Sequence, residues 1–224
     1  MRNSFLFGIL AIFLLLAGCG TAKETAGSGN RPGTPTPAKE GVKISKENPL
    51  VIDKEKKVVS VYATVNGKYL VEPTRHGLNF VEGKYGSQAV FMAYSNPLDF
   101  HDALTSLEAK PGNNLGGDSK DTVIKGDPLK VTVTWEGAGK EYDIDEVFID
   151  STGKKLDYKF GGNIDNAMDK FTGCHLCFDS CPVGITSNSS HSVNTFENKK
   201  AEFKGNKDVL PKDGTPVVVT FKAI

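Results

Sequence analysis

Apolar and polar side chains alternate along several stretches of this chain, and this alternation predicts β-strands. Residues 57–65, KVVSVYATV, carry apolar side chains at every second position, which is typical of a strand with one buried face. The stretch LKVTVTWEG at 129–137 repeats the alternation. It predicts a second strand with Val131, Val133 and Trp135 on the core side.

Neighbouring stretches predict two hairpins and two buried strands. Asn66-Gly67 lies between the first strand and KYLVEP, and this dipeptide favours a tight hairpin turn. DEVFID and LDYKF, at 145–150 and 156–160, predict a second hairpin. The run AVFMAY at 89–94 predicts a buried strand, and the C-terminal TPVVVTFKAI predicts a central one, because both are almost continuously apolar.

One clear helix is predicted over residues 97–109. Asn96 is suited to cap it, and Pro97 is suited to its first position. Apolar side chains then recur at the helical spacing until a Pro-Gly pair stops the pattern. A short second helix is expected at 164–171. Since strands dominate, we predict an α+β fold: a single antiparallel-sheet-rich domain with one well-defined helix and a Cys-rich loop insert.

The N-terminus has the features of an export signal. Arg2 precedes an apolar run from Phe5 to Ala17, which is shorter than the roughly 20 residues of a spanning helix. The sequence Leu-Ala-Gly-Cys19 that follows resembles the bacterial lipoprotein signal, in which this Cys is lipidated and becomes the new N-terminus. We therefore expect a signal peptide at 1–18 and a lipid on Cys19. The protein would be anchored in the cell membrane and would face outside the cytoplasm.

A polar segment separates this anchor from the folded part. Residues 19–42 are rich in Gly, Pro and Thr, a composition that predicts a flexible tether. A globular domain is then expected over 43–224. Basic and acidic residues balance at 27 each, and no basic or aromatic cluster suggests nucleic acid. The expected partners are the membrane, through the anchor, and an envelope redox protein.

Three of the four cysteines lie close together in FTGCHLCFDSCPVG. Cys174, Cys177 and Cys181 form C-x2-C-x3-C-P, the spacing of the last three members of the bacterial ferredoxin run. The position of the first member is Phe171, so the usual set of four thiolates lacks one. An iron–sulfur cluster also needs export in a folded state, which twin arginines typically signal, whereas this signal has a single arginine.

The same sulfurs have other uses in an oxidising compartment. Cys174 and Cys177 are suited to a redox disulfide, with Cys181 as a resolving or free thiol. A bond from Cys181 to either of the others would only staple a loop. The three thiolates together with His175 or His191 would instead give the donor set that zinc or copper(I) favours. These alternatives remain open at the level of sequence.

The Cys motif therefore predicts electron or thiol transfer at the membrane surface, by redox chemistry or through a bound metal. The alternative is a non-catalytic binding or assembly lipoprotein whose cysteines form a structural disulfide. His76 and His101 stand apart from the motif, and single histidines are more often structural than functional. Neither a catalytic triad nor a phosphate-binding loop is recognisable, so enzymatic activity is left undecided.

Six segments in the folded part carry a family resemblance. They are NPLVIDKEKKVVSVYATVNGKY, TRHG, NPLDFHDALTSLEAKPG, FGGN, TGCHLCFDSCPVGI and GTPVVVTF. Over residues 49–224 the chain resembles the YdjY-like bacterial lipoproteins, a family commonly labelled ferredoxin-like or 4Fe–4S-type. The resemblance implies that Cys174, Cys177 and Cys181 are ligands of an iron–sulfur cluster.

Overall fold

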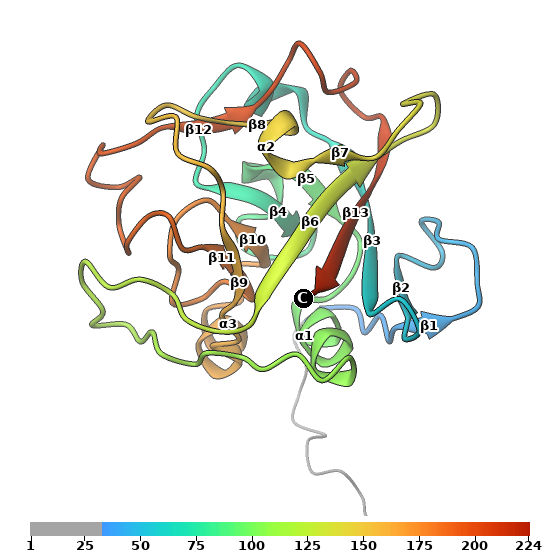
Figure 1. The fold of residues 1–224 in the computed structure, drawn as a ribbon, viewed down its shortest axis with the longest axis horizontal. Coiled ribbons are helices and arrows are strands. Elements are labelled where there is room, and N and C mark those ends of the chain that lie inside the picture. Colours follow the sequence, from blue (N-terminus) through green and yellow to red (C-terminus); the bar gives the residue numbers. More distant parts are fainter. Residues whose placement is uncertain (1–32) are drawn as a thin grey trace, which may run out of the picture. The chain divides into compact units, whose positions relative to one another are not determined.

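The central feature of the computed structural model is a closed β-barrel. The structure describes residues 33–224, so the predicted signal peptide, Cys19 and most of the predicted tether lie outside the described residues. Eight strands pair side by side around the barrel (Figure 1). In order of pairing they are β3 (Val58–Val65), β13 (Pro216–Ala223), β6 (Pro128–Thr134), β9 (Tyr158–Phe160), β11 (Thr186–Asn188), β10 (Cys174–Cys177), β4 (His76–Phe80) and β5 (Ala89–Ala93).

The barrel closes where β5 pairs with β3. Ala63 lies opposite Ala93, and Val65 lies opposite Phe91, while β3 also pairs with β13. The predicted α+β class is therefore wrong, because the strands form a closed barrel accompanied only by small helices. The Cys-rich loop insert is also wrong in part, since Cys174 and Cys177 lie in a strand of the barrel wall. Alternation shows which side chains face the core, but it does not show which distant strands pair.

The other elements of the described chain surround this barrel. They are the strands β1 (Lys39–Glu40), β2 (Leu50–Asp53), β7 (Tyr142–Asp143), β8 (Phe148–Asp150) and β12 (Phe203–Gly205), the helices α1 (Pro97–Ser106), α2 (Ile144–Val147) and α3 (Ile164–Lys170), and the 3₁₀ helices η1 (Gly67–Leu70) and η2 (Gly86–Gln88). Strands β8 and β12 form a separate two-stranded sheet. In Figure 1, α1 and α3 lie on the side of the barrel opposite that sheet. No helix in the part of the chain that the structure describes has the length and apolar character needed to cross a bilayer.

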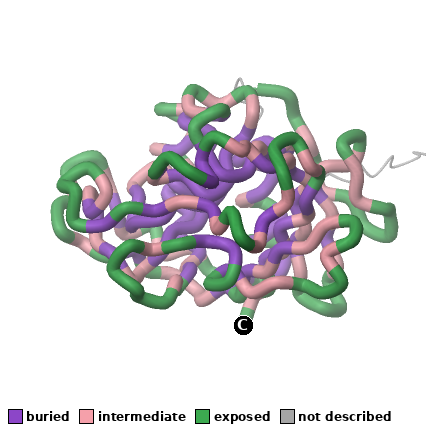
Figure 2. The backbone as a smooth tube through the Cα atoms, turned by 90° about the horizontal axis from the view of Figure 1, so that it is seen from above, coloured by how far each residue is buried: buried purple, intermediate pink, exposed green. Residues whose placement is uncertain are grey.

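The barrel core is built from the alternating strands. Buried side chains in β3 occupy every second position, as the sequence predicted, and they meet the buried face of β13. Figure 2 shows the buried backbone in the centre and the exposed backbone mainly in the connections. Strand β6 buries Val131 and Val133 as predicted. Trp135 lies just beyond its end, half-buried, and stacks on Tyr142 with 4.8 Å between ring centroids.

Helix α1 begins as predicted and ends earlier. The Asn96 side chain accepts a hydrogen bond from the Leu98 N–H, and Pro97 occupies the first turn. The helix ends at Ser106 rather than at residue 109, because Glu108 takes a left-handed backbone conformation with φ of 65°. The shorter helix predicted at 164–171 is confirmed as α3.

Both predicted hairpins are wrong. After β3 the chain forms η1 instead of a returning strand, and the Gly67 N–H donates to the Asp213 carboxylate over 2.7 Å. Strand β8 pairs with β12, and β9 pairs with β6 and β11. Turn composition is a local signal, and here strand pairing between distant segments determines the structure.

The chain just before residue 43 contacts the barrel domain. The Thr34 side chain hydrogen-bonds to Glu82, and the Thr36 N–H donates to Asp99 over 2.6 Å. Strand β1 pairs with β2 in parallel. Residues 34–40, which belong to the segment predicted as a tether, therefore run along the domain.

Candidate functional site

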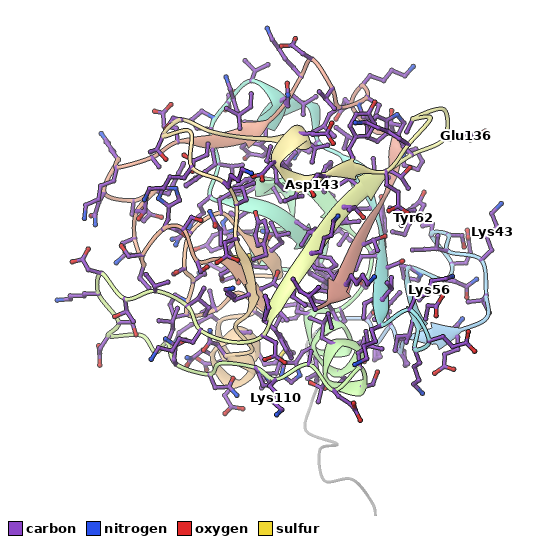
Figure 3. The ribbon with its side chains drawn as sticks, in the orientation of Figure 1. Lys43, Lys56, Tyr62, Lys110, Glu136 and Asp143 are labelled. Atoms are coloured by element: carbon purple, nitrogen blue, oxygen red, sulfur yellow. A yellow bond between two sulfur atoms is a disulfide. The ribbon has the colours of Figure 1, made fainter. Side chains whose placement is uncertain are left out.

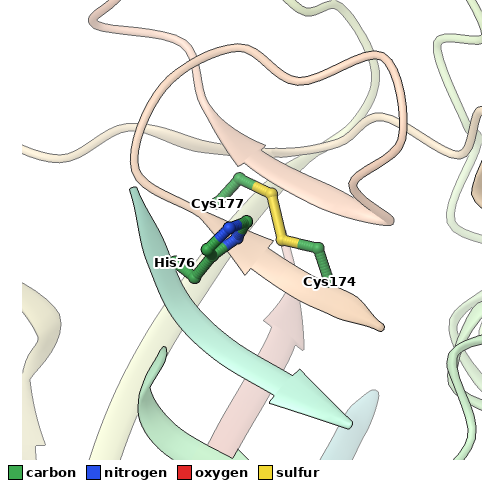
Figure 4. A group of neighbouring side chains, drawn as sticks. All are labelled: His76, Cys174 and Cys177. Atoms are coloured by element: carbon green, nitrogen blue, oxygen red, sulfur yellow. A yellow bond between two sulfur atoms is a disulfide. The ribbon is translucent and has the colours of Figure 1, made fainter. Parts of the chain in front are cut away.

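The sulfurs of Cys174 and Cys177 lie beside the imidazole ring of His76 (Figure 4). The two sulfurs are joined as a disulfide. One donor atom from each of the three side chains lies within 4.8 Å of the others. All three residues are buried, so the group forms a sulfur–imidazole cluster inside the barrel wall.

Strand pairing explains why His76 meets the cysteines. His76 on β4 lies opposite Cys177 on β10, and side chains opposite one another in paired strands are neighbours. Residues three apart in a regular strand point to opposite faces. The pairing of β4 with β10 is irregular between Cys174 and Cys177, and such irregularities break the alternation. Both sulfurs can therefore meet on one side.

His76 has an unused nitrogen in this cluster. Its Nδ1 is buried, and no residue within 33–224 forms a hydrogen bond to it. The ring stacks on Tyr85 with 5.8 Å between centroids. Burial and the charge of neighbouring Arg75 lower the pKa of His76 to about 3. At neutral pH the imidazole is therefore uncharged and retains a nitrogen lone pair.

A buried ion pair borders the cluster. Arg75 donates to Asp179 over 3.1 Å and to Glu197 over 3.0 Å, and the Asp179 side chain is fully buried. Burial raises the pKa of Asp179, although the charge of Arg75 opposes that rise. The Phe196 N–H also donates to this carboxylate. These contacts fasten the turn after β10 to the start of β4.

Cys181 completes the sulfur group without being bonded to it. Its thiol is free and buried, and it packs with Cys174 and Cys177. Burial raises the pKa of the Cys181 thiol, against the charge of Arg75, so the thiol is protonated at neutral pH. Cys181 and His76 both line a cavity of about 340 Å³. A methyl group on Gly184 would lie 2.7 Å from the Cys177 sulfur. The backbone at Gly184 therefore runs directly beside the cluster and leaves no space for a side chain.

The two histidines predicted as metal ligands have other partners. His175 lies between the cysteines in sequence, but its ring bonds the Ser95 hydroxyl and the Gly173 carbonyl, each over 3.1 Å. Burial lowers the pKa of His175 to about 4. His191 pairs with Asp150 over 2.6 Å. The cluster therefore contains His76 in place of His175 or His191.

The donor set around Cys174, Cys177 and Cys181 does not fit an iron–sulfur cluster. Phe171 occupies the position of the first ferredoxin cysteine, and its ring packs edge-on against Phe80 with 6.2 Å between centroids. Even with the Cys174–Cys177 pair reduced, the described residues offer three thiolates here, whereas a [4Fe–4S] cluster is normally held by four. The fourth cysteine of the chain, Cys19, lies outside the described residues.

Comparison with known proteins identifies the family. Residues 50–222 match the YdjY domain. The chain belongs to the YdjY family. It is 40% identical over 221 residues to the "Uncharacterized protein YdjY" of Escherichia coli strain K12, a match that covers 96% of this chain and 94% of that protein. No solved structure matches. The family resemblance of the six sequence segments is thus confirmed.

His76 is the site residue that sequence reasoning did not connect to the cysteines. It precedes Cys174 by almost 100 residues, and the segment TRHG has no metal-ligand or catalytic spacing. Only the pairing of β4 with β10 brings the two segments of this YdjY-family chain together. The sequence signal that could have pointed to His76 was its place at the start of the short stretch HGLNF, which forms β4.

Proposed function

We propose that this YdjY-family protein is a lipid-anchored extracytoplasmic redox protein whose Cys174–Cys177 pair accepts and returns two electrons. The observation that carries the proposal is a C-x2-C disulfide with a third thiol, Cys181, in the same buried cluster. A bond between residues three apart closes a very short loop and adds only about 2 kcal/mol to stability by the entropic account. Stabilisation of the fold alone is therefore a weak explanation for the presence of this disulfide.

The reaction needs a partner with two thiols. A thiolate of an envelope dithiol protein attacks one sulfur of the pair, and a mixed disulfide forms as the Cys174–Cys177 bond breaks. The second thiol of the partner then attacks the partner's own sulfur in the mixed disulfide, which forms the partner's disulfide and releases the second thiolate of this chain. The chain gains two electrons and two protons, and the reverse sequence returns them. We propose that the partner thiol reaches the disulfide through the cavity that Cys181 and His76 line.

Reduction of the native protein is the direct test. We expect dithiothreitol at neutral pH to add two alkylatable thiols to the folded full chain, purified with detergent. The thiols are counted by mass spectrometry after acid quenching, unfolding and alkylation. A Cys174→Ser/Cys177→Ser double variant should lose this gain, whereas Cys181→Ser should retain it. The reduction potential should lie above about −300 mV, since structural disulfides typically lie below that value.

The opposite result would support the alternative function. A disulfide that resists dithiothreitol until the chain unfolds, or a potential below about −300 mV, would assign the bond to stabilisation. The protein would then be a binding or assembly lipoprotein without thiol chemistry.

The lipid anchor is tested separately. The proposal rests on the export signal and on Cys19 in its Leu-Ala-Gly-Cys context. We expect the protein to fractionate with membranes and Cys19→Ala to reduce that fraction strongly, because the acylated residue is removed. Cys181→Ser is the matched control and should stay with the membranes. Equal membrane association of Cys19→Ala and the parent protein would contradict the anchor.

A further inference from the structure

We infer that the dithiol form of the cluster binds one zinc ion through His76, Cys174 and Cys177. The inference rests on the proposed function, because only the reduced pair offers thiolates. Donor atoms of the three side chains already lie within 4.8 Å of one another. A tetrahedral zinc ion with bonds of about 2.0–2.3 Å holds its ligand atoms roughly 3.5–3.8 Å apart. Once the disulfide is reduced, the main change needed is separation of the two sulfurs.

The unused nitrogen of His76 is the second observation that points to a ligand. His76 is only 7% exposed, and no described residue bonds its buried Nδ1. Buried polar atoms in proteins are normally hydrogen-bonded, so each exception needs an explanation. The other two buried histidines differ, since His175 bonds Ser95 and His191 bonds Asp150. A metal ion beside the sulfurs would bind this ring, because one of its two nitrogens lies within 4.8 Å of both sulfurs.

Charge balance favours a divalent ion. Two thiolates neutralise a 2+ cation, and a neutral imidazole adds no charge, so a site buried in the barrel wall carries no net charge. The positive charge of Arg75 is already met by Asp179 and Glu197. A monovalent ion would leave one negative charge buried. Zinc also accepts a mixed set of sulfur and nitrogen ligands in a tetrahedral arrangement.

The number of ligands indicates an open site. Three protein ligands are typical of zinc sites that keep a fourth position for water or a substrate. Cys181 packs in the sulfur group, but among residues 33–224 the set that converges within 4.8 Å consists of His76, Cys174 and Cys177. His76 also lines the cavity of about 340 Å³, which provides the access path that a metal site requires.

The test compares reduced and oxidised full-length protein under anaerobic conditions, freed of metal and excess reductant. Zinc is titrated in competition with a chromogenic chelator, and cobalt(II) serves as a spectroscopic probe. We expect one ion per reduced chain, a tetrahedral cobalt spectrum with a thiolate charge-transfer band, and no binding to the disulfide form. His76→Gln should lower zinc affinity by at least about 10–100-fold. Loss of a residue that merely supports a metal ligand already has an effect of that size, and His76 is a ligand itself.

His101→Gln is the matched control. His101 lies on α1, where it contacts Asp102 and Phe160, so this variant should bind zinc like the parent. The melting temperature of each disulfide form shows whether the substitution affects the fold. If His76→Gln does not fold, X-ray absorption spectroscopy of the zinc-loaded parent protein identifies the ligands instead. Two sulfurs and one imidazole are then expected, and a set without imidazole would overturn the assignment.

The outcomes separate this inference from the proposed function. A disulfide that cannot be reduced in the folded chain overturns both. A chain that gains two thiols but binds no zinc, or a folded His76→Gln variant that binds zinc as tightly as the parent, overturns the zinc site alone.

Discussion

Replacing Arg75 with Ala is expected to lower the free energy of unfolding by about 3–5 kcal/mol. The Asp179 side chain is fully buried, and that of Arg75 is 20% exposed. Without the guanidinium, the carboxylate would keep the hydrogen bond from the Phe196 N–H, but its charge would have no counterion in the interior. Loss of one partner from a buried ion pair is costly because the remaining charge stays desolvated.

Urea unfolding of the full-length protein measures this effect. Lys56→Ala is the control, because Lys56 and Asp53 form an exposed pair near the rim of the domain (Figure 3), and such pairs contribute about 0–1 kcal/mol. The double variant Arg75→Met/Asp179→Leu should recover much of the loss, since it removes both charges and fills the space. An Arg75→Ala variant as stable as Lys56→Ala would show that the buried pair is unimportant for folding.

Phe100→Ala is the second substitution with a large expected effect, also about 3–5 kcal/mol. Phe100 is fully buried on α1. Its ring lies 4.8 Å, centroid to centroid, from His175 on β10 and equally far from Phe221 on β13. Truncation leaves a cavity where the helix meets two strands of the barrel. The rigid wall is expected to collapse only partly into that cavity.

The same unfolding measurement tests the role of Phe100. Val71→Ala is the control, because Val71 is 69% exposed and surface substitutions usually change stability by no more than about 0.5 kcal/mol. Phe100→Leu should lose less stability than Phe100→Ala, since it keeps more of the apolar volume. If Phe100→Ala were as stable as Val71→Ala, α1 would not depend on this contact.

Strand prediction succeeded where the signal was local. The alternation in 57–65 and the apolar C-terminal run both correspond to barrel strands that pair with each other. The cap at Asn96 was predictable because its hydrogen bond spans two residues. Asn66-Gly67 was misleading, because the Gly67 N–H bonds Asp213, 146 residues away.

The site was predictable in its sulfur atoms and not in its histidine. The spacing of Cys174 and Cys177 indicated a disulfide or a metal site. His175 is the histidine nearest in sequence, but its side chain bonds Ser95 and packs on Phe100. Side chains of adjacent residues in a strand point to opposite faces. Proximity in sequence was therefore a poor guide to proximity in the site.

The order of residues along the chain was enough to predict the family, most of the strands, the start of the main helix and the group of three cysteines. These features depend on the order of residues over short distances, where hydrophobic periodicity, capping and spacing act. Closure of the strands into a barrel, and the position of His76 beside Cys174 and Cys177, became visible only in the folded chain. Both results depend on the register between strands far apart in the chain, and that register is selected by burial of whole strand faces rather than by any local pattern.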